Sequence, residues 1–261
     1  IWDFTRTELL LRDDGLAVWK WDPNVKPHVT DTNNATDGDI LIAYALALAG
    51  TAWKRNDYIV AASRMAQALL AETVVRSAGR TLLMPGSEGF GAADRDDGPV
   101  VNPSYWIYEA MPVMAALAPS DAWKELSDDG VALLKTMQFG PRKLPAEWVS
   151  LSGPPRPAEG FDAEFAYNAL RIPLYLARGG ITDKTLLNRL RKGMSQDGIP
   201  AAIDLTTGRP KTPLPEPGYE IVNDVVACVV DGGKLPVSAL QFAAALYDPA
   251  TLQVLGLGYI G

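Results

Sequence analysis

The chain has 261 residues and a formal net charge of −7, from 24 Lys and Arg against 31 Asp and Glu. This acidic balance argues against a nucleic-acid-binding protein, which usually carries a basic patch. The single cysteine excludes an internal disulfide framework, and the single histidine excludes a multi-histidine metal site. No apolar run reaches the roughly 18 residues of a membrane span.

Apolar residues that recur at three- and four-residue spacing predict helices along most of the chain. The clearest helix is expected over Asp37–Trp53, where alanines four residues apart indicate tight packing on more than one face. One segment, Gly79–Pro85, is expected to form a short strand. The other expected helices are Asp57–Arg76, Pro103–Leu117, Ser120–Met137, Asp162–Arg178, Thr182–Gly193, Glu220–Val230, Val237–Leu246 and Pro249–Leu255.

Three long loops rich in Pro and Gly interrupt this pattern, over residues 86–101, 140–159 and 206–218. Each loop follows a pair of helices, so none of them reads as a single boundary between two domains. Loops of this length in a compact domain usually carry function. We therefore expect one all-helical domain over residues 1–261, built from stacked helical hairpins.

A polar and acidic segment, residues 30–39, directly precedes the most apolar helix. Thr36 fits the N-cap position and Asp39 the third helical position, as in a capping box with Asp in place of Glu. Asp37 would then lie in the first turn, where the helix dipole favours a carboxylate. A calcium loop does not fit, because Ala35 falls where an oxygen ligand is required.

At these residues the sequence resembles glycoside hydrolase family 8. The run from Ala35 to Leu46 is similar to the family's signature, and further segments follow in the family's order. These segments are Trp19–Trp21, Leu83–Gly86, Asn102–Tyr105 and Ala169–Pro173. Within the family, the chain is most similar to the short bacterial endoglucanases found with cellulose synthesis. The resemblance implies an (α/α)6 barrel, a β-glucan substrate, no cofactor or metal, and a periplasmic or secreted location.

The resemblance also implies an inverting mechanism, in which one carboxyl group acts as acid and another activates a water. The family's general acid is a Glu well upstream of the motif that contains Asp37. Before Asp37 the only Glu is Glu8, whose surroundings resemble the second helix of the family rather than the first. We therefore expect the acid-bearing first helix to lie upstream of this chain, which alone would fold incompletely or bind glycan without cutting it.

Asp37 matches the family's Asp that holds and distorts the sugar at the cleavage point. Asp39 is assigned to structural support of the same helix start. Asn168 stands where many members carry the base, and an amide can orient a water but cannot accept its proton as a base. Asp162 and Glu164 are therefore the candidate bases, with helix N-terminal charge as the alternative interpretation.

The substrate is expected to rest on aromatic rings and on side chains that bind sugar hydroxyls. Arg171 lies three residues after Asn168, on the same face of the expected helix, and is expected to pair with a carboxylate. Core packing is the alternative for Trp19, and a helix start is the alternative for Asn102. The candidate substrate-binding residues are Trp19, Tyr105, Asn102, Ser104, Tyr167 and Arg171.

The leading hypothesis is endo-acting hydrolysis of β-1,4-glucan oligosaccharides or polysaccharides, with no nucleic-acid partner and no membrane span. Two alternatives stay open. The substrate could be another β-glycan, namely lichenin, chitosan or xylan, or the chain could be a helical module that binds glycan without hydrolysis. The sequence does not indicate an oligomeric state.

Overall fold

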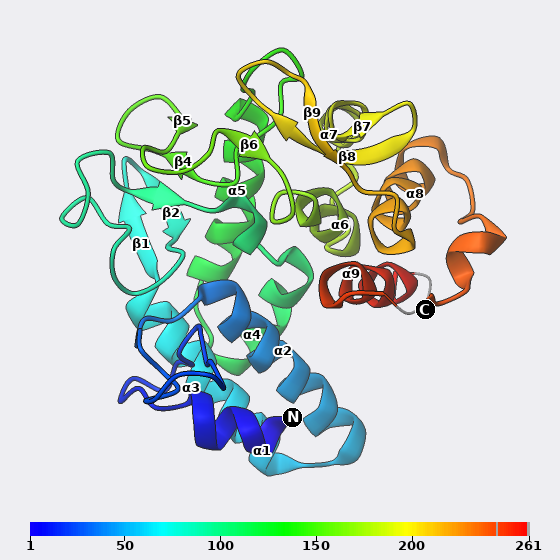
Figure 1. Cartoon of the computed structure of the whole chain (residues 1–261). Helices are drawn as coiled ribbons and strands as arrows, with labels where there is room; N and C mark the ends of the chain where they lie inside the picture. The colour runs from blue at the N-terminus through cyan, green and yellow to red at the C-terminus, as the bar shows by residue number, and fades with distance from the viewer. Residues whose placement is uncertain (244, 260–261) are drawn as a thin grey trace. The chain divides into compact units, whose positions relative to one another are not determined.

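A computed structural model describes residues 1–243 and 245–259 (Figure 1). The chain divides into two units, Ile1–Gly130 and Val131–Gly261, and each is described by itself. None of the helices in the described residues is long and apolar enough to cross a membrane.

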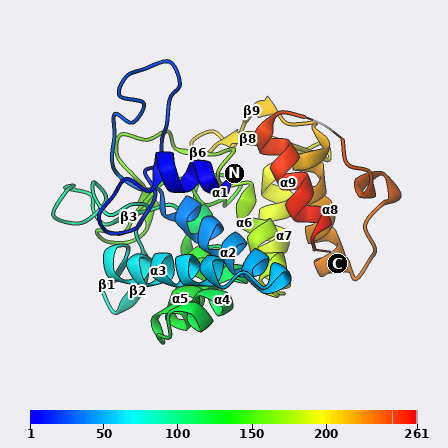
Figure 2. The same ribbon diagram turned by 90° about the horizontal axis from the view of Figure 1, so that it is seen from below.

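The first unit is organised around two helices that lie side by side, α2 (Thr36–Trp53) and α3 (Asn56–Glu72) (Figures 1 and 2). Lys54 ends α2 in the left-handed conformation, with φ of 55°, so the chain reverses within two residues. Gly50 allows the close approach, because a Cβ there would lie 2.7 Å from Ile59 Cδ1. The remaining elements are α1 (Trp2–Phe4), a π-helical turn (Thr5–Leu9), β1 (Val74–Ser77), β2 (Arg80–Leu83), β3 (Val100–Val101), 3-10 turns (Pro103–Tyr105 and Tyr108–Ala110), α4 (Met111–Leu117) and α5 (Ala122–Thr136), which runs into the second unit.

The expected helix over Asp57–Arg76 is too long, because α3 ends at Glu72. The β-branched pair that follows forms β1, which pairs antiparallel with β2, the strand expected within Gly79–Pro85. Ala78 and Gly79 both have positive φ, at 48° and 76°, as a tight two-residue hairpin turn requires.

The second unit combines helices with a small antiparallel sheet that the periodicity did not predict. Its central strand, β8, is buried at four of its six positions and pairs with β6, β7 and β9. The strands are β4 (Val149–Ser150), β5 (Arg156–Pro157), β6 (Glu164–Phe165), β7 (Ser195–Gln196), β8 (Ile199–Asp204) and β9 (Pro210–Pro213). The helices are α6 (Arg171–Arg178), α7 (Lys184–Met194), α8 (Pro217–Asp231), a 3-10 turn (Val237–Leu240) and α9 (Tyr247–Leu257).

Three expected helices are shorter or broken. The one expected over Asp162–Arg178 begins only at Arg171, because residues 164–165 pair with β8 and residues 167–170 form turns. The one expected over Pro103–Leu117 is split into 3-10 turns and α4. Over Val237–Leu246 the helical part is Val237–Leu240, and Ala244 lies outside the described residues.

Two arginines satisfy carbonyl groups at the ends of helices in the second unit. Arg189 donates to the carbonyls of Leu134, Met137 and Lys143, around the end of α5. Arg142 donates to the carbonyl of Gly193 near the end of α7. The last carbonyls of a helix have no partner within the helix, so these contacts stabilise both helix ends.

Two glycines with similar backbone conformations give a matched test of packing in this unit. Gly140 has φ of 62°, and a Cβ there would lie 1.7 Å from the Leu205 carbonyl oxygen. Gly180 has φ of 73°, with nothing within 4 Å of the same point. We expect Gly180→Ala to lower the free energy of unfolding by about 1–2 kcal/mol, the cost of left-handed backbone. Gly140→Ala should cost clearly more, and equal losses in urea denaturation would contradict the described contact.

Candidate active site

The start of α2 is fixed by the segment that follows β2. The Thr36 backbone amide donates to the Pro85 carbonyl at 2.9 Å, and the Thr36 hydroxyl donates to the Met84 carbonyl at 2.7 Å. The N-cap residue is Ala35, and no side chain caps this helix. The expected capping box of Thr36 and Asp39 is therefore wrong, since both side chains bind groups outside the first turn.

Asp39 is buried, and its carboxylate joins the helix to two other segments. One oxygen accepts from the Ala17 backbone amide at 2.8 Å, and the other accepts from Asn34 Nδ2 at 2.9 Å. Burial raises the pKa of Asp39 to about 7, and its two hydrogen bonds oppose that rise. The carboxylate thus holds residues 17 and 34 against the first turn of α2.

Asp37 lies two residues earlier, half-buried in the first turn of the same helix. Its Oδ1 accepts from the Gly38 backbone amide at 2.9 Å. The positive end of the helix dipole attracts negative charge at this position. The assignment of Asp37 to sugar binding stays a prediction, and the structure places its carboxylate on the fixed helix start described above.

Trp19 lies on the loop that Asp39 holds, with 53% of the residue exposed. Its indole Nε1 donates to Asp31 Oδ2 at 2.8 Å, and its backbone amide donates to the Asn33 carbonyl at 3.0 Å. Hydrogen bonds from the Asn33 backbone amide and from Trp19 lower the pKa of Asp31. Trp21, two residues on, instead packs its ring on His28 at 4.7 Å. Trp19 therefore offers an exposed ring whose orientation is set by Asp31.

Asn102 and Ser104 are fully buried at a short 3-10 turn. Asn102 Oδ1 accepts from the backbone amide and the hydroxyl of Ser104, at 3.1 and 2.8 Å. These are the contacts of the helix-start interpretation, while Asn102 Nδ2 has no hydrogen-bond partner among the described residues. Tyr105, next in the chain, is half-buried. Sugar contacts by these three residues stay predictions.

In the second unit, Asn168 lies in a turn directly before α6 rather than within a helix. Glu147 accepts two hydrogen bonds from it: from the Asn168 backbone amide at 2.7 Å and from Asn168 Nδ2 at 3.2 Å. Arg171 Nη2 donates to Asn168 Oδ1 at 2.7 Å. Arg171 and Asn168 therefore do contact each other, although the shared helix face expected from the sequence does not exist.

Both candidate bases contact one lysine. Lys211 Nζ lies 2.6 Å from Glu164 Oε2 and 3.5 Å from Asp162 Oδ2. Glu164 belongs to β6 and Asp162 precedes it, so neither carries helix N-terminal charge as the alternative interpretation required. Tyr167 is 46% exposed and meets the Tyr219 ring edge-on at 6.3 Å.

Glu147 was not found from the sequence, because it lies in a long loop with no periodic pattern. Burial raises its pKa, and the nearby charge of Glu164 adds to the rise. A signal was present nonetheless. Glu147 is a lone acid between apolar residues, in the run Ala146–Val149, and a carboxylate in such a run is a candidate for burial.

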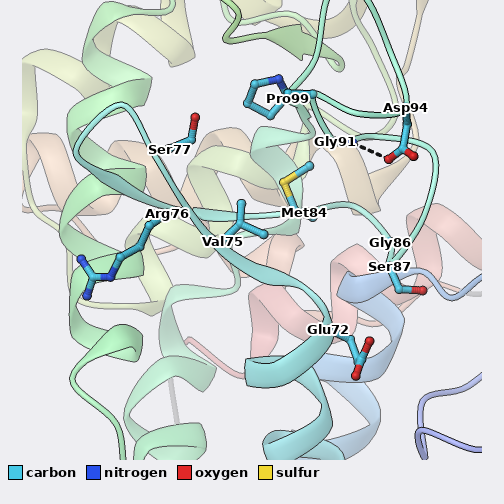
Figure 3. A pocket seen from close by; sticks show the side chains of 11 residues that line it. Glu72, Val75, Arg76, Ser77, Met84, Gly86, Ser87, Gly91, Asp94 and Pro99 are labelled. Carbon is cyan, nitrogen blue, oxygen red and sulfur yellow. Dashed lines mark hydrogen bonds between the residues drawn. The ribbon is translucent and has the colours of Figure 1, made fainter.

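A pocket of about 260 Å³ in the first unit lies beside the β1–β2 hairpin (Figure 3). Glu72, Arg76 and Asp94 contribute charged groups to its lining, and the Gly91 backbone amide donates to Asp94 Oδ2 at 3.0 Å. None of the predicted site residues lines it. In the part of the chain that is described, no group of three or more His, Cys, Asp or Glu could hold a metal ion.

The pKa of Asp39 predicts how stability changes with pH. Its folded pKa of about 7 lies above the usual 3.8, so the folded state binds more protons than the unfolded state between these values. Stability therefore falls as pH rises from about 4 to 7, by up to about 4 kcal/mol, and then levels. Asp39→Asn, which cannot ionise, should flatten this slope in urea denaturation across the range. Equal slopes for both proteins would contradict the burial described.

Comparison with known proteins identifies the family of the chain. The family model described as "Glycosyl hydrolases family 8" matches residues 1–259. A probable endoglucanase of Novacetimonas hansenii is 32% identical over 259 residues, which cover 96% of this chain and 73% of that protein. An endoglucanase of Cellulomonas uda is 38% identical over 179 residues, which cover 68% of this chain and 49%, about half, of that protein.

A solved structure gives the same result for the fold. The endo-β-1,4-glucanase CMCax of Acetobacter xylinum superposes with a TM-score of 0.88 at 30% identity. The match covers 99% of this chain and 81% of that one. Sequence and structure thus agree over nearly all the residues compared, and the chain belongs to family 8 of the glycosyl hydrolases.

Proposed function

We propose that the protein is an endo-acting β-1,4-glucanase that cleaves with inversion, on an (α/α)6 barrel fold. The observation that carries the proposal is the position of Asp37. Its carboxylate lies in the first turn of α2, within the signature-like run, and the helix start is tied to Met84, Pro85 and Ala17. Relatives named as endoglucanases support β-glucan as the substrate.

In this mechanism Asp37 binds the sugar at the cleavage point and stabilises positive charge as it develops. The transition state of glycoside hydrolysis resembles an oxocarbenium ion, so a fixed carboxylate stabilises it more than the ground state. Asp39 acts as structural support, because it fixes the helix start and the Trp19 loop together.

Asn168 orients the attacking water through its carboxamide, and a carboxylate takes the proton from that water. The departing glycosidic oxygen receives its proton from a general acid, which the family resemblance assigns to a Glu upstream of the motif that contains Asp37. Glu164 and Asp162 are the candidate bases, and each forms an ion pair with Lys211. Of the two, Glu164 is bound more closely, at 2.6 Å against 3.5 Å, and its side chain is less exposed. Glu164 is therefore the better held of the two bases.

The glucan chain is bound by aromatic rings and polar side chains. Trp19 is the main platform, since its exposed ring is held in one orientation by Asp31. Apolar faces of pyranose rings stack on such surfaces. Tyr105 and Tyr167 provide further rings, while Asn102, Ser104 and Arg171 bind hydroxyls.

The wider assignments follow from the same family membership. Residues 1–261 belong to a single catalytic domain that needs no cofactor, and its partner is a β-glucan rather than a nucleic acid. The protein acts in the periplasm or outside the cell, as expected for the bacterial endoglucanases that it resembles.

The test compares, in the full-length protein, two aspartates that hold equivalent helix positions. Asp37 and Asp57 are each the second residue of their helices, α2 and α3. Asp37→Asn should lower reducing-sugar release from carboxymethylcellulose by about 10²–10³-fold, because a transition-state charge is lost. Cello-oligosaccharide binding, measured by calorimetry, should persist. Asp57→Asn should leave the rate unchanged, because Asp57 is exposed and pairs only with Arg55 among the ion pairs described.

The outcomes separate the alternatives. If Asp37→Asn keeps near-normal activity, its assigned role is wrong. Binding of cello-oligosaccharide without any hydrolysis by the full-length protein would favour a glycan-binding module. A protein that neither binds nor hydrolyses β-1,4-glucan would contradict the proposed function as a whole.

A further inference from the structure

The carboxamide of Asn168 is held at both of its ends. Glu147 Oε2 lies 3.2 Å from Nδ2, and Arg171 Nη2 lies 2.7 Å from Oδ1. A carboxylate can only accept hydrogen bonds and a guanidinium can only donate them. The amide therefore has one orientation, with its nitrogen toward Glu147 and its oxygen toward Arg171. One Nδ2 hydrogen and one Oδ1 lone pair remain for other partners.

The backbone of the same residue is fixed by the same acid. Glu147 Oε1 accepts from the Asn168 backbone amide at 2.7 Å. The backbone amide of Glu147 in turn donates to the Glu164 carbonyl at 3.0 Å, which anchors the acid to the segment carrying a candidate base. Position and side-chain orientation of Asn168 thus depend on one carboxylate.

We propose that Glu147 is a positioning residue for the hydrolysis. It fixes Asn168 so that the amide presents one donor and one acceptor to the attacking water. The proposal rests on the proposed function, in which Asn168 orients that water. It adds a residue that none of the family-like segments contains.

The chemistry at this position requires a carboxylate. Glutamine could accept from the backbone amide or from Nδ2, but its own NH₂ would then face the second donor. Burying a carboxylate is costly when no cation compensates it, and no Lys or Arg forms an ion pair with Glu147 among the described residues. At this position both oxygens of the buried carboxylate are needed, because one accepts from the Asn168 backbone amide and the other from Asn168 Nδ2.

The experiment substitutes Glu147 and Asn168, first singly and then together. In the full-length protein, Glu147→Gln alone should lower kcat on cellopentaose about tenfold to a hundredfold, because a misplaced water reacts slowly. KM should stay within about twofold, because the glucan platforms are untouched. Glu220→Gln, the same substitution at an exposed position on α8, is the matched control and should leave both constants unchanged.

The double variant Glu147→Gln with Asn168→Asp restores the hydrogen bond between the two side chains, with donor and acceptor exchanged. The glutamine introduced at position 147 can accept from the backbone amide of residue 168 while its NH₂ donates to the new carboxylate. We expect the double variant to be at least about tenfold faster than Asn168→Asp alone, in which two carboxyl groups meet at the 3.2 Å contact. This rescue also decides the question if Glu147→Gln by itself does not fold.

Two results would overturn the proposal. One is a kcat for Glu147→Gln equal to that of the Glu220→Gln control. The other is a loss of kcat that only follows the loss of folded protein in urea denaturation, with no rescue in the double variant.

A measurement that does not depend on activity separates this proposal from the proposed function. The NMR signals of the Asn168 side-chain NH₂ should shift in Glu147→Gln and not in Glu220→Gln, whether or not the protein hydrolyses glucan. Signals unchanged in Glu147→Gln would show that Glu147 does not hold the amide.

Discussion

The buried carboxylate of Asp39 is the constraint on which the first unit's candidate site depends. Its two oxygens accept from the Ala17 backbone amide and from Asn34 Nδ2, so it joins two loop segments to the start of α2. Burial of that charge is costly, as its pKa of about 7 shows. The carboxylate nevertheless places Asp37, on α2, and the Trp19 loop on one fixed framework.

The second unit repeats this arrangement with different residues. Glu147 is also buried, and it too accepts from one backbone amide and from one asparagine side chain. In both units a carboxylate that is not itself assigned to chemistry orders a segment that is. These two acids are hard to replace, because a side chain that lacks either acceptor oxygen leaves a buried donor without an acceptor.

Periodicity predicts well the helices in which apolar residues recur at three- and four-residue spacing from end to end. α2, α5, α7 and α8 begin and end within a few residues of their expected bounds. The resemblance to family 8 needed only the local run from Ala35 to Leu46 and was confirmed over residues 1–259. Local sequence was sufficient there because a short, specific pattern identifies a whole family.

Features that depend on tertiary contacts could not be predicted from the sequence. Residues 164–165 form β6 because β8 lies beside them, and no local pattern reveals a partner about 40 residues away. Thr36 has the right side chain to cap α2, yet its hydroxyl donates to Met84 instead, because that carbonyl is brought close by the β1–β2 hairpin. Glu147 was missed for the same reason, since its partner Asn168 is distant in sequence and the loop between them has no periodicity.

The most direct test of the account is the anomeric form of the first product. Single displacement by a water on the opposite face of the sugar inverts the anomeric carbon, so cleavage of a β-1,4 bond releases the α-anomer. Proton NMR of cellopentaose hydrolysis, recorded before mutarotation, should show the α-anomeric signal growing first. If the β-anomer appears first, the inverting mechanism assigned to this protein is wrong.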